Sequence, residues 1–519
     1  MKIIRREFLK SATAAGLGVG LGAPPLMAVT GSSGDAGIAA GIAARPSMAA
    51  PLARPNFLVL IADDMTFRAI HALNNPEIET PNLDRLVHSG CSFTHCFHQG
   101  AWEPAVCVPS RHMLNTGLTG FRARRLVDQT PLWGETFGQA GYDTYFIGKW
   151  HVTEASLKRS FREIGREGPG MFVSGLTAYN RPSPGNTWTP WDTSLRGHWI
   201  HTDIWENARH DEIKHSAQIW ADGASDYLLK QAGSNTPFFM YVGFNSPHDP
   251  RQSPKEFVDR YPKERIEIPP NYLPEFPFDQ GDHRGRDELL APFPRTHEAI
   301  QVHRAEYYAH ITYMDTQIGR ILDALEKSGK AANTYVIFTA DHGLAVGQHG
   351  LMGKQNLYDH SIRMPLLISG PGIAKGKRID AMVYQHNLFA TTCDLAGIPI
   401  PKTVEFPSLA DLITGSSERE KYDAIFSYME WNMPAMANWL KPPVIQNYRM
   451  SQRTVRTRSH KLIIYPLAGM TQLFDLEKDP WEIHNVADKT EHAALKRSLR
   501  QRLVSLQREL GDDLVLPQI

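Results

Sequence analysis

The sequence predicts an α/β protein whose central sheet is mainly parallel and sandwiched by helices, followed by a small C-terminal antiparallel sheet with a terminal helix. The first indication is a series of short apolar runs that each end in polar residues, at 56–61, 142–147, 238–244 and 334–339. The second is the helical spacing of apolar residues between these runs, clearest at 306–327. The third is a change at about residue 406 to short strands, which precede an amphipathic stretch at 493–510.

The first 28 residues are typical of an export signal. Arg5-Arg6 is followed by Phe8-Leu9-Lys10, and an apolar run rich in Ala and Gly occupies residues 12–26. This pattern resembles a twin-arginine signal, which predicts a periplasmic or secreted protein and the twin-arginine translocase as a partner. Residues 29–54 are small and rich in Gly, Ala and Pro, and we expect a disordered linker there. An uncleaved membrane anchor is the alternative for the apolar run.

Charge and cysteine content exclude two classes of protein. Lys plus Arg and Asp plus Glu both number 55, so the formal net charge is zero and we expect no nucleic acid as a partner. Four cysteines in 519 residues are too few for a scaffold held by disulfides. We expect Cys91, Cys96 and Cys393 to be small buried residues, with a Cys91–Cys96 disulfide as the alternative in an oxidising compartment.

The apolar run at residues 56–61 is predicted to be a buried central strand, and it leads into Asp63-Asp64. Carboxylates at the carboxyl end of such a strand lie where open α/β sheets bind their ligands. Because adjacent carboxylates repel each other, a bound cation is the simplest reason to keep the two together. A solvated turn is the alternative, and it fits less well directly after a buried strand.

Further polar residues flank the later strands. Taken singly, each also fits an ordinary loop or a structural histidine. Their recurrence at successive strand ends is hard to explain in that way and indicates a functional site. The residues are Lys149 and His151 after the strand at 142–147, His248 after 238–244, Asp341 and His342 after 334–339, and Lys354 before a strand at 364–369.

Residues 107–117 read C-V-P-S-R-H-M-L-N-T-G and are predicted to form a helix. Pro109 suits the first turn, where its missing N–H costs nothing, and Gly117 suits the position just past the end. Cys107 is then expected at the helix N-terminus, where free N–H groups and the helix dipole stabilise an anion. Arg111, one turn further on, can reach the same anion. A buried or merely reactive cysteine is the alternative.

The C-x-P-S-R stretch from Cys107 to Arg111, with Leu114 and Thr116-Gly117, resembles the signature of the type I sulfatases, which belong to the alkaline-phosphatase-like superfamily. The order of the other motifs is similar too: Asp-Asp, G-K-x-H, a His after the next long strand, D-H-G and a Lys. The resemblance spans residues 54–400, with a weaker match at 473–476 and 479–480. It implies an alkaline-phosphatase-like catalytic domain at residues 55–405 and a C-terminal subdomain at 406–519.

The resemblance implies a sulfuric ester hydrolase in which Cys107 is oxidised to formylglycine (3-oxoalanine) by a formylglycine-generating system, and the aldehyde hydrate is the nucleophile. The implied metal site consists of Asp63, Asp64, Asp341, His342 and residue 107 itself. Carboxylate ligands favour Ca²⁺ first and Mg²⁺ second. His342 stands where the family often has Asn, so its role, as metal ligand or sulfate contact, stays open.

The remaining site residues receive roles from the same resemblance. The implied sulfate-binding residues are Arg111, Lys149, His248 and Lys354. His248 with Lys354 protonates the departing alcohol, and His151 takes a proton when sulfate is released. A phosphonate or phosphodiester hydrolase on the same scaffold is one alternative. A glycan-binding protein in which Cys107 is never oxidised is another.

A variable insertion at residues 154–235 bears on the substrate, because flat aromatic faces beside polar donors suit a sugar ring. The aromatic side chains in this insertion are Trp188, Trp191, Trp199 and Trp205, and the polar side chains among them are Arg196, His198 and His201. Packing of a long loop explains the tryptophans equally well. We expect a sulfated carbohydrate, with choline sulfate or an aryl sulfate as the alternative, since the same tryptophans can cage a quaternary ammonium. A second irregular stretch, at 249–297, fits a lid or the wall of a binding site.

Overall fold

The computed structural model describes residues 54–170, 204–207, 212–249, 251, 253–281, 286–433 and 448–518. Residues 53–519 form one compact unit, which contains both the predicted catalytic domain and the predicted C-terminal subdomain. The predicted export signal and linker lie outside the described residues, except for Arg54. The tryptophan-rich cluster at 188–205 also lies outside the described side chains.

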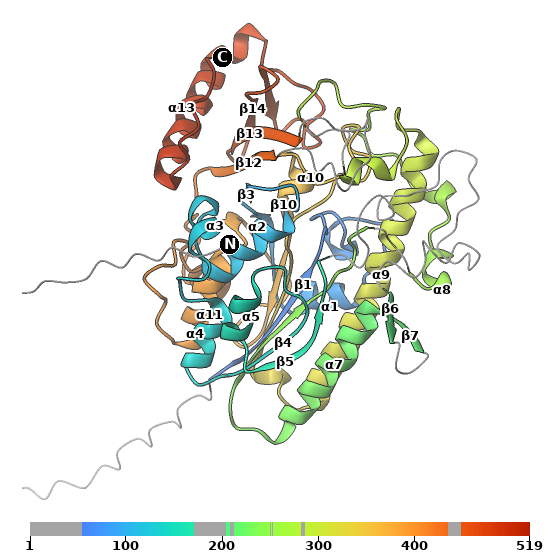
Figure 1. The fold of residues 1–519 in the computed structure, drawn as a ribbon, viewed down its shortest axis with the longest axis vertical. Coiled ribbons are helices and arrows are strands. Elements are labelled where there is room, and N and C mark those ends of the chain that lie inside the picture. Colours follow the sequence, from blue (N-terminus) through green and yellow to red (C-terminus); the bar gives the residue numbers. More distant parts are fainter. Residues whose placement is uncertain are drawn as a thin grey trace, which may run out of the picture. The chain divides into compact units, whose positions relative to one another are not determined.

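An eight-stranded sheet forms the centre of this unit (Figure 1), in the order β11-β2-β10-β9-β1-β8-β4-β5. Every residue of β1 (Asn56–Ala62) is buried, and β1 pairs in parallel with β8 (Phe238–Gly243) and with β9 (Thr334–Ala340). β10 (Arg363–Ser369) runs antiparallel to β9 and to β2 (Cys91–Phe97). The other strands are β4 (Asp143–Lys149), β5 (Glu163–Gly168) and β11 (Lys377–Tyr384). The predicted α/β fold with a mainly parallel sheet is confirmed.

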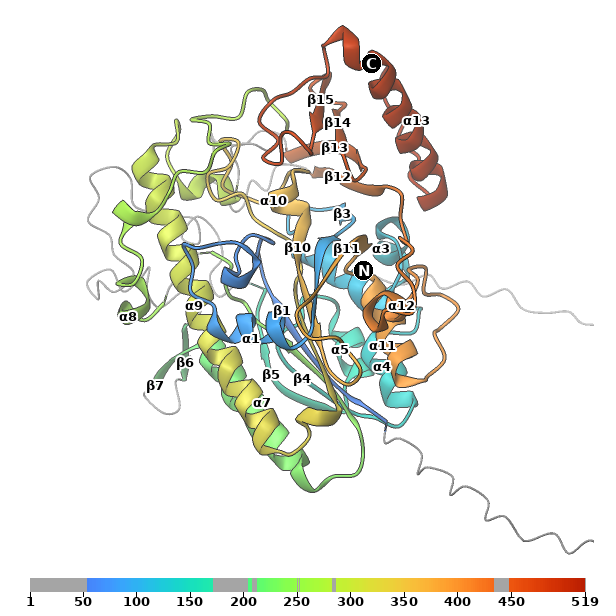
Figure 2. The same ribbon diagram turned by 180° about the vertical axis from the view of Figure 1, so that it is seen from behind.

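Helices cover both faces of the sheet, which explains why its central strands β1, β8 and β9 are buried throughout and mostly apolar (Figures 1 and 2). α1 (Pro81–Ser89), α7 (Ser216–Lys230) and α9 (His297–Lys327) lie on one face. The other face carries α2 (Cys107–Thr116), α4 (Trp133–Gln139), α5 (Glu154–Ser160) and α11 (Asn387–Ala396).

The long helix α9 begins earlier than residue 306, where the apolar stripe predicted its start. Thr296 caps the helix because its Oγ1 accepts a hydrogen bond from Ala299 N (3.1 Å). Within α9, the carboxylate of Asp315 accepts hydrogen bonds from Asn82 N (3.0 Å) and Leu83 N (2.7 Å), in the first turn of α1. α9 therefore fixes the segment that follows β1.

A second sheet, in the order β15-β14-β13-β12-β3, confirms the predicted C-terminal sheet. Its antiparallel strands are β12 (Ile425–Met433), β13 (Tyr448–Arg456), β14 (His460–Tyr465) and β15 (Met470–Asp475). The terminal helix α13 (Ala493–Leu510) packs Leu499, Leu503 and Leu506 into the core of this sheet.

The short strand β3 (Gly100–Ala101) comes from the N-terminal half and joins β12 in parallel, which the sequence did not predict. Gly100 has φ +114°, and a Cβ there would lie 1.8 Å from Tyr428 O. Only glycine permits so close an approach of the two backbones.

The three remaining cysteines agree with the sequence analysis. Cys91, Cys96 and Cys393 are buried and free within the described part of the chain. None of the helices described here has the length and apolar character needed to cross a membrane.

Buried ion pairs join the second sheet to the segment that follows Lys354. Lys461 Nζ in β14 lies 2.6 Å from Asp359 Oδ1 and 2.6 Å from Glu482 Oε1. Glu482 also accepts a hydrogen bond from Asp359 N (2.8 Å). All three side chains are buried, so each charge needs its partner. This arrangement holds the chain between Lys354 and β10 against the second sheet.

Replacing Lys461 with Met should lower the free energy of unfolding by about 3–5 kcal/mol, because Glu482 would lose the cation beside its buried carboxylate. Urea denaturation followed by circular dichroism measures the loss. Lys478→Met is the matched control, because Lys478 pairs with Asp475 but its side chain is 86% exposed, and its change should stay within about 0.5 kcal/mol. Equal losses for the two variants would contradict a structural role for the buried pairs.

Candidate active site

The charged residues predicted to form a site come together at the carboxyl ends of β1 and β9. They lie next to the N-terminus of α2, and Arg111, Lys149, Lys354, Asp63, Asp64, Asp341 and His342 are all fully buried. The parallel pairing of β1 with β9 explains why these residues come together. Ala62, the last residue of β1, pairs with Ala340, the last residue of β9, so Asp63 and Asp341 follow neighbouring strand ends.

Helix α2 has the boundaries that residues 107–117 predicted. Cys107 is its first residue, and Gly117 follows its last residue with φ 65° and donates its N–H to Met113 O (2.8 Å). Two side chains that the sequence analysis did not select tie the helix to β9. Ser110 Oγ donates to Asp341 O (2.5 Å), directly after β9, and lies 3.1 Å from Gln385 Oε1, while Gln385 Nε2 donates to Ala340 O (2.9 Å). The start of α2 is thus held against the metal-site candidates.

The surroundings of Cys107 favour a negative charge at this position. Its Sγ lies 3.2 Å from His151 Nδ1 and 3.7 Å from Lys149 Nζ. Burial alone would raise the pKa of the thiol, but Lys149 and His151 hold that pKa well below its usual value. The same groups would stabilise any anionic oxygen carried by residue 107.

Two of these residues adopt backbone conformations that non-glycine residues rarely use. Asp64 has φ 68° and His151 has φ 57°, both in the left-handed region. Such a conformation costs on the order of 1–2 kcal/mol and is typical of functional positions. Here it directs the two side chains to the edge of the sheet where the charges meet.

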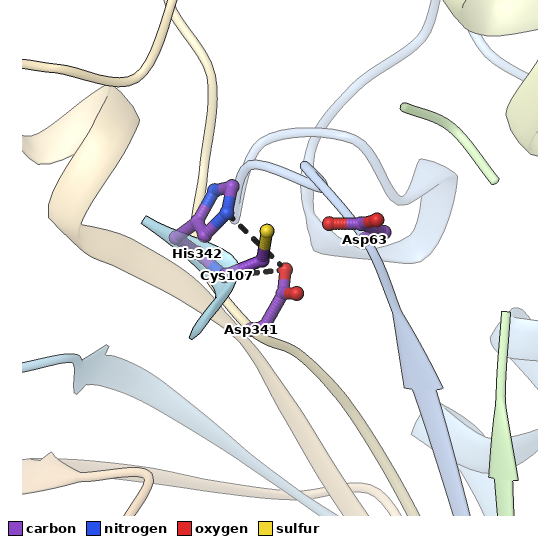
Figure 3. Close-up of side chains that lie close together, drawn as sticks. All are labelled: Asp63, Cys107, Asp341 and His342. Atoms are coloured by element: carbon purple, nitrogen blue, oxygen red, sulfur yellow. Dashed lines mark hydrogen bonds and ion pairs between the residues drawn. The ribbon is translucent and has the colours of Figure 1, made fainter. Parts of the chain in front are cut away.

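Four side chains turn their ligand atoms toward one another in a group suited to a metal ion (Figure 3). Asp63, Cys107, Asp341 and His342 each offer one such atom, all within 4.8 Å of one another. Asp63 Oδ1 and His342 Nε2 are buried and have no hydrogen-bond partner among the described residues. Burial, with Asp63 close by, raises the pKa of Asp341 to about 6. The group thus combines buried carboxylates with unpartnered ligand atoms, and a divalent cation fits that donor set.

The ring of His342 is oriented as a metal ligand requires. Its Nδ1 lies 3.0 Å from Gly343 O, so Nδ1 carries the proton. Nε2 then faces Asp64 Oδ1 at 3.3 Å and Asp341 Oδ1 at 3.6 Å. Burial opposes a second proton, but Asp341 and Asp64 raise the pKa of His342 to about 9. The two carboxylates therefore stabilise a positive charge at this position.

Asp64 is in contact with a second group of site residues. Lys354 Nζ lies 2.8 Å and 2.9 Å from the two Asp64 carboxylate oxygens and 2.9 Å from His248 Nε2. Burial and Lys354 lower the pKa of His248, but Asp64 raises it, and the net direction is upward. Tyr307 Oη donates to Asp64 O (2.7 Å) and accepts from Thr66 N (3.0 Å). Its place in an apolar stripe gave no signal of this role.

The predicted sulfate-binding residues surround the carboxylates. Lys149 Nζ pairs with Asp63 Oδ2, and Arg111 Nε donates to Asp341 Oδ2 (2.9 Å). Arg111 Nη1 donates to Lys149 O (2.6 Å), whereas Nη2 is buried without a hydrogen-bond partner in the described structure. Three cations thus lie beside three carboxylates, and the lysines contact Asp63 and Asp64 directly.

Comparison with known proteins identifies relatives of this chain over most of its length. A family model described as Sulfatase matches residues 55–398, and one described as N-sulphoglucosamine sulphohydrolase, C-terminal, matches residues 347–509. The arylsulfatase of Clostridium perfringens is 28% identical over 483 residues, covering 87% of this chain and 94% of that protein. The ulvan-active sulfatase of Formosa agariphila is 27% identical over 476 residues, covering 89% and 82%.

A solved structure shares the fold. It is described as BT4656 in complex with its substrate D-glucosamine-2-N,6-O-disulfate. The two chains superpose with a TM-score of 0.68 at 21% identity, covering 89% of this chain and 99% of the other.

Replacing Tyr307 with Phe should weaken binding of a divalent cation, because the Asp64 backbone would lose the hydroxyl that fixes it. We expect the Kd for Ca²⁺, measured by isothermal titration calorimetry, to rise by roughly 10-fold or more. Tyr227→Phe is the matched control, since the Tyr227 hydroxyl is buried and has no hydrogen-bond partner in the described part of the chain. An unchanged Kd in Tyr307→Phe would show that the hydroxyl does not position Asp64.

Proposed function

Because this chain belongs to the sulfatase family, we propose that it removes sulfate from a sulfated carbohydrate, using a formylglycine at position 107 and a divalent cation. The family makes it a sulfuric ester hydrolase. The observation that carries the rest of the proposal is the pairing of an anion-stabilising position at residue 107 with a buried group of ligand atoms, of which Asp63 Oδ1 and His342 Nε2 have no hydrogen-bond partner among the described residues.

Oxidation of Cys107 by a formylglycine-generating system fits its surroundings. When formed, the aldehyde hydrate supplies a nucleophilic oxygen and a second hydroxyl through which sulfate can be released. His151 Nδ1, 3.2 Å from the Cys107 sulfur, is placed to take the proton of that second hydroxyl. The thiol itself stands in for these oxygens in the present structure. Burial lowers the pKa of His151, so the neutral imidazole can accept a proton.

The cation is proposed to be held by Asp63, Asp64, Asp341, His342 and residue 107 itself. When bound, it offsets the negative charge that a sulfate ester brings into the site. Three carboxylates favour a hard ion, so Ca²⁺ is the first choice and Mg²⁺ the second. With the carboxylates engaged by the ion, the ammonium groups of Lys149 and Lys354 become available to sulfate oxygens.

Four side chains would then bind the substrate and supply the proton for the departing alcohol. Arg111 Nη2, which is buried and unpartnered among the described residues, can donate to a sulfate oxygen together with the two lysines. His248 Nε2, 2.9 Å from Lys354 Nζ, can give a proton to the oxygen of the departing alcohol. Water restores the enzyme, so one water is consumed for each alcohol and sulfate released.

The substrate and the place of action are proposals that rest on relatives and on residues 1–28. Relatives named for sulfated carbohydrates, such as the ulvan-active sulfatase, support a glycan substrate. The twin-arginine-like start supports export by the twin-arginine translocase to the periplasm or beyond, after folding and Cys107 oxidation in the cytoplasm. The substrate would then be met outside the cytoplasm.

Mass spectrometry of the peptide that contains Cys107 should show the aldehyde rather than the thiol. Cys107→Ala should remove turnover, and Cys107→Ser should be nearly inactive, because neither residue offers the second hydroxyl needed to release sulfate. We expect kcat to fall by roughly 10³-fold or more in both variants. Wild-type kcat in either variant would rule out the aldehyde.

A substrate panel tests the carbohydrate proposal. Sulfated oligosaccharides, choline sulfate, nitrophenyl sulfate and a phosphonate monoester are incubated with the purified enzyme, and released sulfate or phosphonate is measured. We expect kcat/KM for the preferred glycan to exceed that for choline sulfate at least ~10-fold, because a site built for sugar hydroxyls rejects compounds that lack them. Efficient hydrolysis of choline sulfate without release from any glycan would overturn the carbohydrate proposal.

A further inference from the structure

Two oppositely charged side chains close to His248 in the sequence are buried, and their hydrogen-bonding atoms are unused within the described structure. Asp249 is 4% exposed and Arg251 is 1% exposed. Neither oxygen of the Asp249 carboxylate and none of the three Arg251 guanidinium nitrogens has a hydrogen-bond partner in the described structure. Buried polar atoms normally have hydrogen-bond partners, so the unused atoms of both groups indicate a ligand that binds there.

Both side chains lie on the side of the site where the departing alcohol receives its proton. Ligand atoms of Asp64, His248 and Asp249 lie within 4.8 Å of one another, and Asp249 Oδ1 is 3.9 Å from His248 Nδ1. The Arg251 guanidinium stacks over the Tyr307 ring at 5.3 Å, and the Tyr307 hydroxyl contacts Asp64 O. Asp249 and Arg251 thus flank the His248–Lys354 pair rather than the nucleophile.

The chemistry of the two groups defines a complementary ligand. A carboxylate without donors around it accepts hydrogen bonds from hydroxyl groups. A guanidinium whose planar fork is unoccupied matches the oxygens of a carboxylate or a sulfate. A quaternary ammonium offers no hydrogen bond to Asp249 and is repelled by Arg251. A neutral aryl ring leaves both charges unpaired.

We propose that Asp249 and Arg251 bind the sugar that leaves as the alcohol, and that this sugar carries a second anionic group. Arg251 binds the second anionic group, and Asp249 accepts hydrogen bonds from the hydroxyl groups of the sugar. This inference rests on the proposed function and narrows its substrate class to acidic sugars. The second anion is a carboxylate, as in a uronic acid, or a further sulfate, as in a disulfated hexosamine. Arg251 is then a specificity-determining residue.

The test compares sugar sulfates that differ in the second anion. Wild type, Arg251→Met and Arg251→Lys are assayed with N-acetylglucosamine 6-sulfate, glucosamine N,6-disulfate, 2-O-sulfated hexuronates and nitrophenyl sulfate. The wild type should prefer sugars with a second anion. In Arg251→Met, the ratio of kcat/KM for those sugars to kcat/KM for nitrophenyl sulfate should fall roughly 10- to 100-fold, as expected for a lost hydrogen bond to a charged group. Arg251→Lys should recover part of the ratio, and the two anion types separate carboxylate from sulfate recognition.

Arg260→Met is the matched control. Arg260 pairs with Glu79 (3.2 Å) but its side chain is 44% exposed, so the ratio should stay within about 2-fold of wild type. The melting temperatures of both Met variants show whether each variant is folded. The Asp249→Asn variant keeps the shape of the carboxylate. It should raise the KM for the sugars more than the KM for nitrophenyl sulfate.

The possible failures are distinct. If the wild type hydrolyses nitrophenyl sulfate but no sugar sulfate, the carbohydrate proposal fails and this inference fails with it. If the wild type hydrolyses sugar sulfates without preferring a second anion, or if Arg251→Met slows all substrates by the same factor, only this inference is overturned.

Discussion

Burial of three carboxylates and three cations at the ends of β1 and β9 is the constraint on which the rest of the site depends. Asp63, Asp64 and Asp341 are fully buried, as are the three cations beside them. Removing each charge from water costs several kcal/mol, so none is tolerated without a nearby opposite charge. The parallel register of β1 and β9 brings the aspartates together, and α2, β4 and the loop before α10 (Asp359–Ile362) supply the cations.

The outer parts of the fold support this charge arrangement through specific contacts. α9 fixes the backbone of Asp64 through Tyr307, and it fixes the start of α1 through Asp315. The second sheet holds the segment after Lys354 through the buried Lys461 ion pairs. The C-terminal region therefore contributes to the position of Lys354 although it supplies none of the site residues described here.

The positions of the strands and the kinds of side chain at the site were predictable from the sequence. Buried parallel strands appear in the sequence as apolar runs, and the site residues follow the ends of these runs. The predicted strand 56–61 differs from β1 by one residue. The start of α9 was wrong because polar residues such as Gln301 and His303 interrupt the apolar pattern of its first turns, although Ile300 is buried there. Side-chain partners were not predictable, since contacts such as Lys354–Asp64 join residues distant in sequence. Asp249 and Arg251 became notable only when their burial was known.

The central claim is that a cation and an anionic substrate complete this buried charge arrangement. A crystal structure of the protein grown with Ca²⁺ and sulfate tests it most directly. We expect an ion about 2.3–2.6 Å from carboxylate oxygens of Asp63, Asp64 and Asp341, with His342 Nε2 turned toward it. The ammonium groups of Lys149 and Lys354 should then contact sulfate instead of Asp63 and Asp64. A structure at saturating Ca²⁺ with no ion at this position, and with both lysines still on the carboxylates, would contradict the claim.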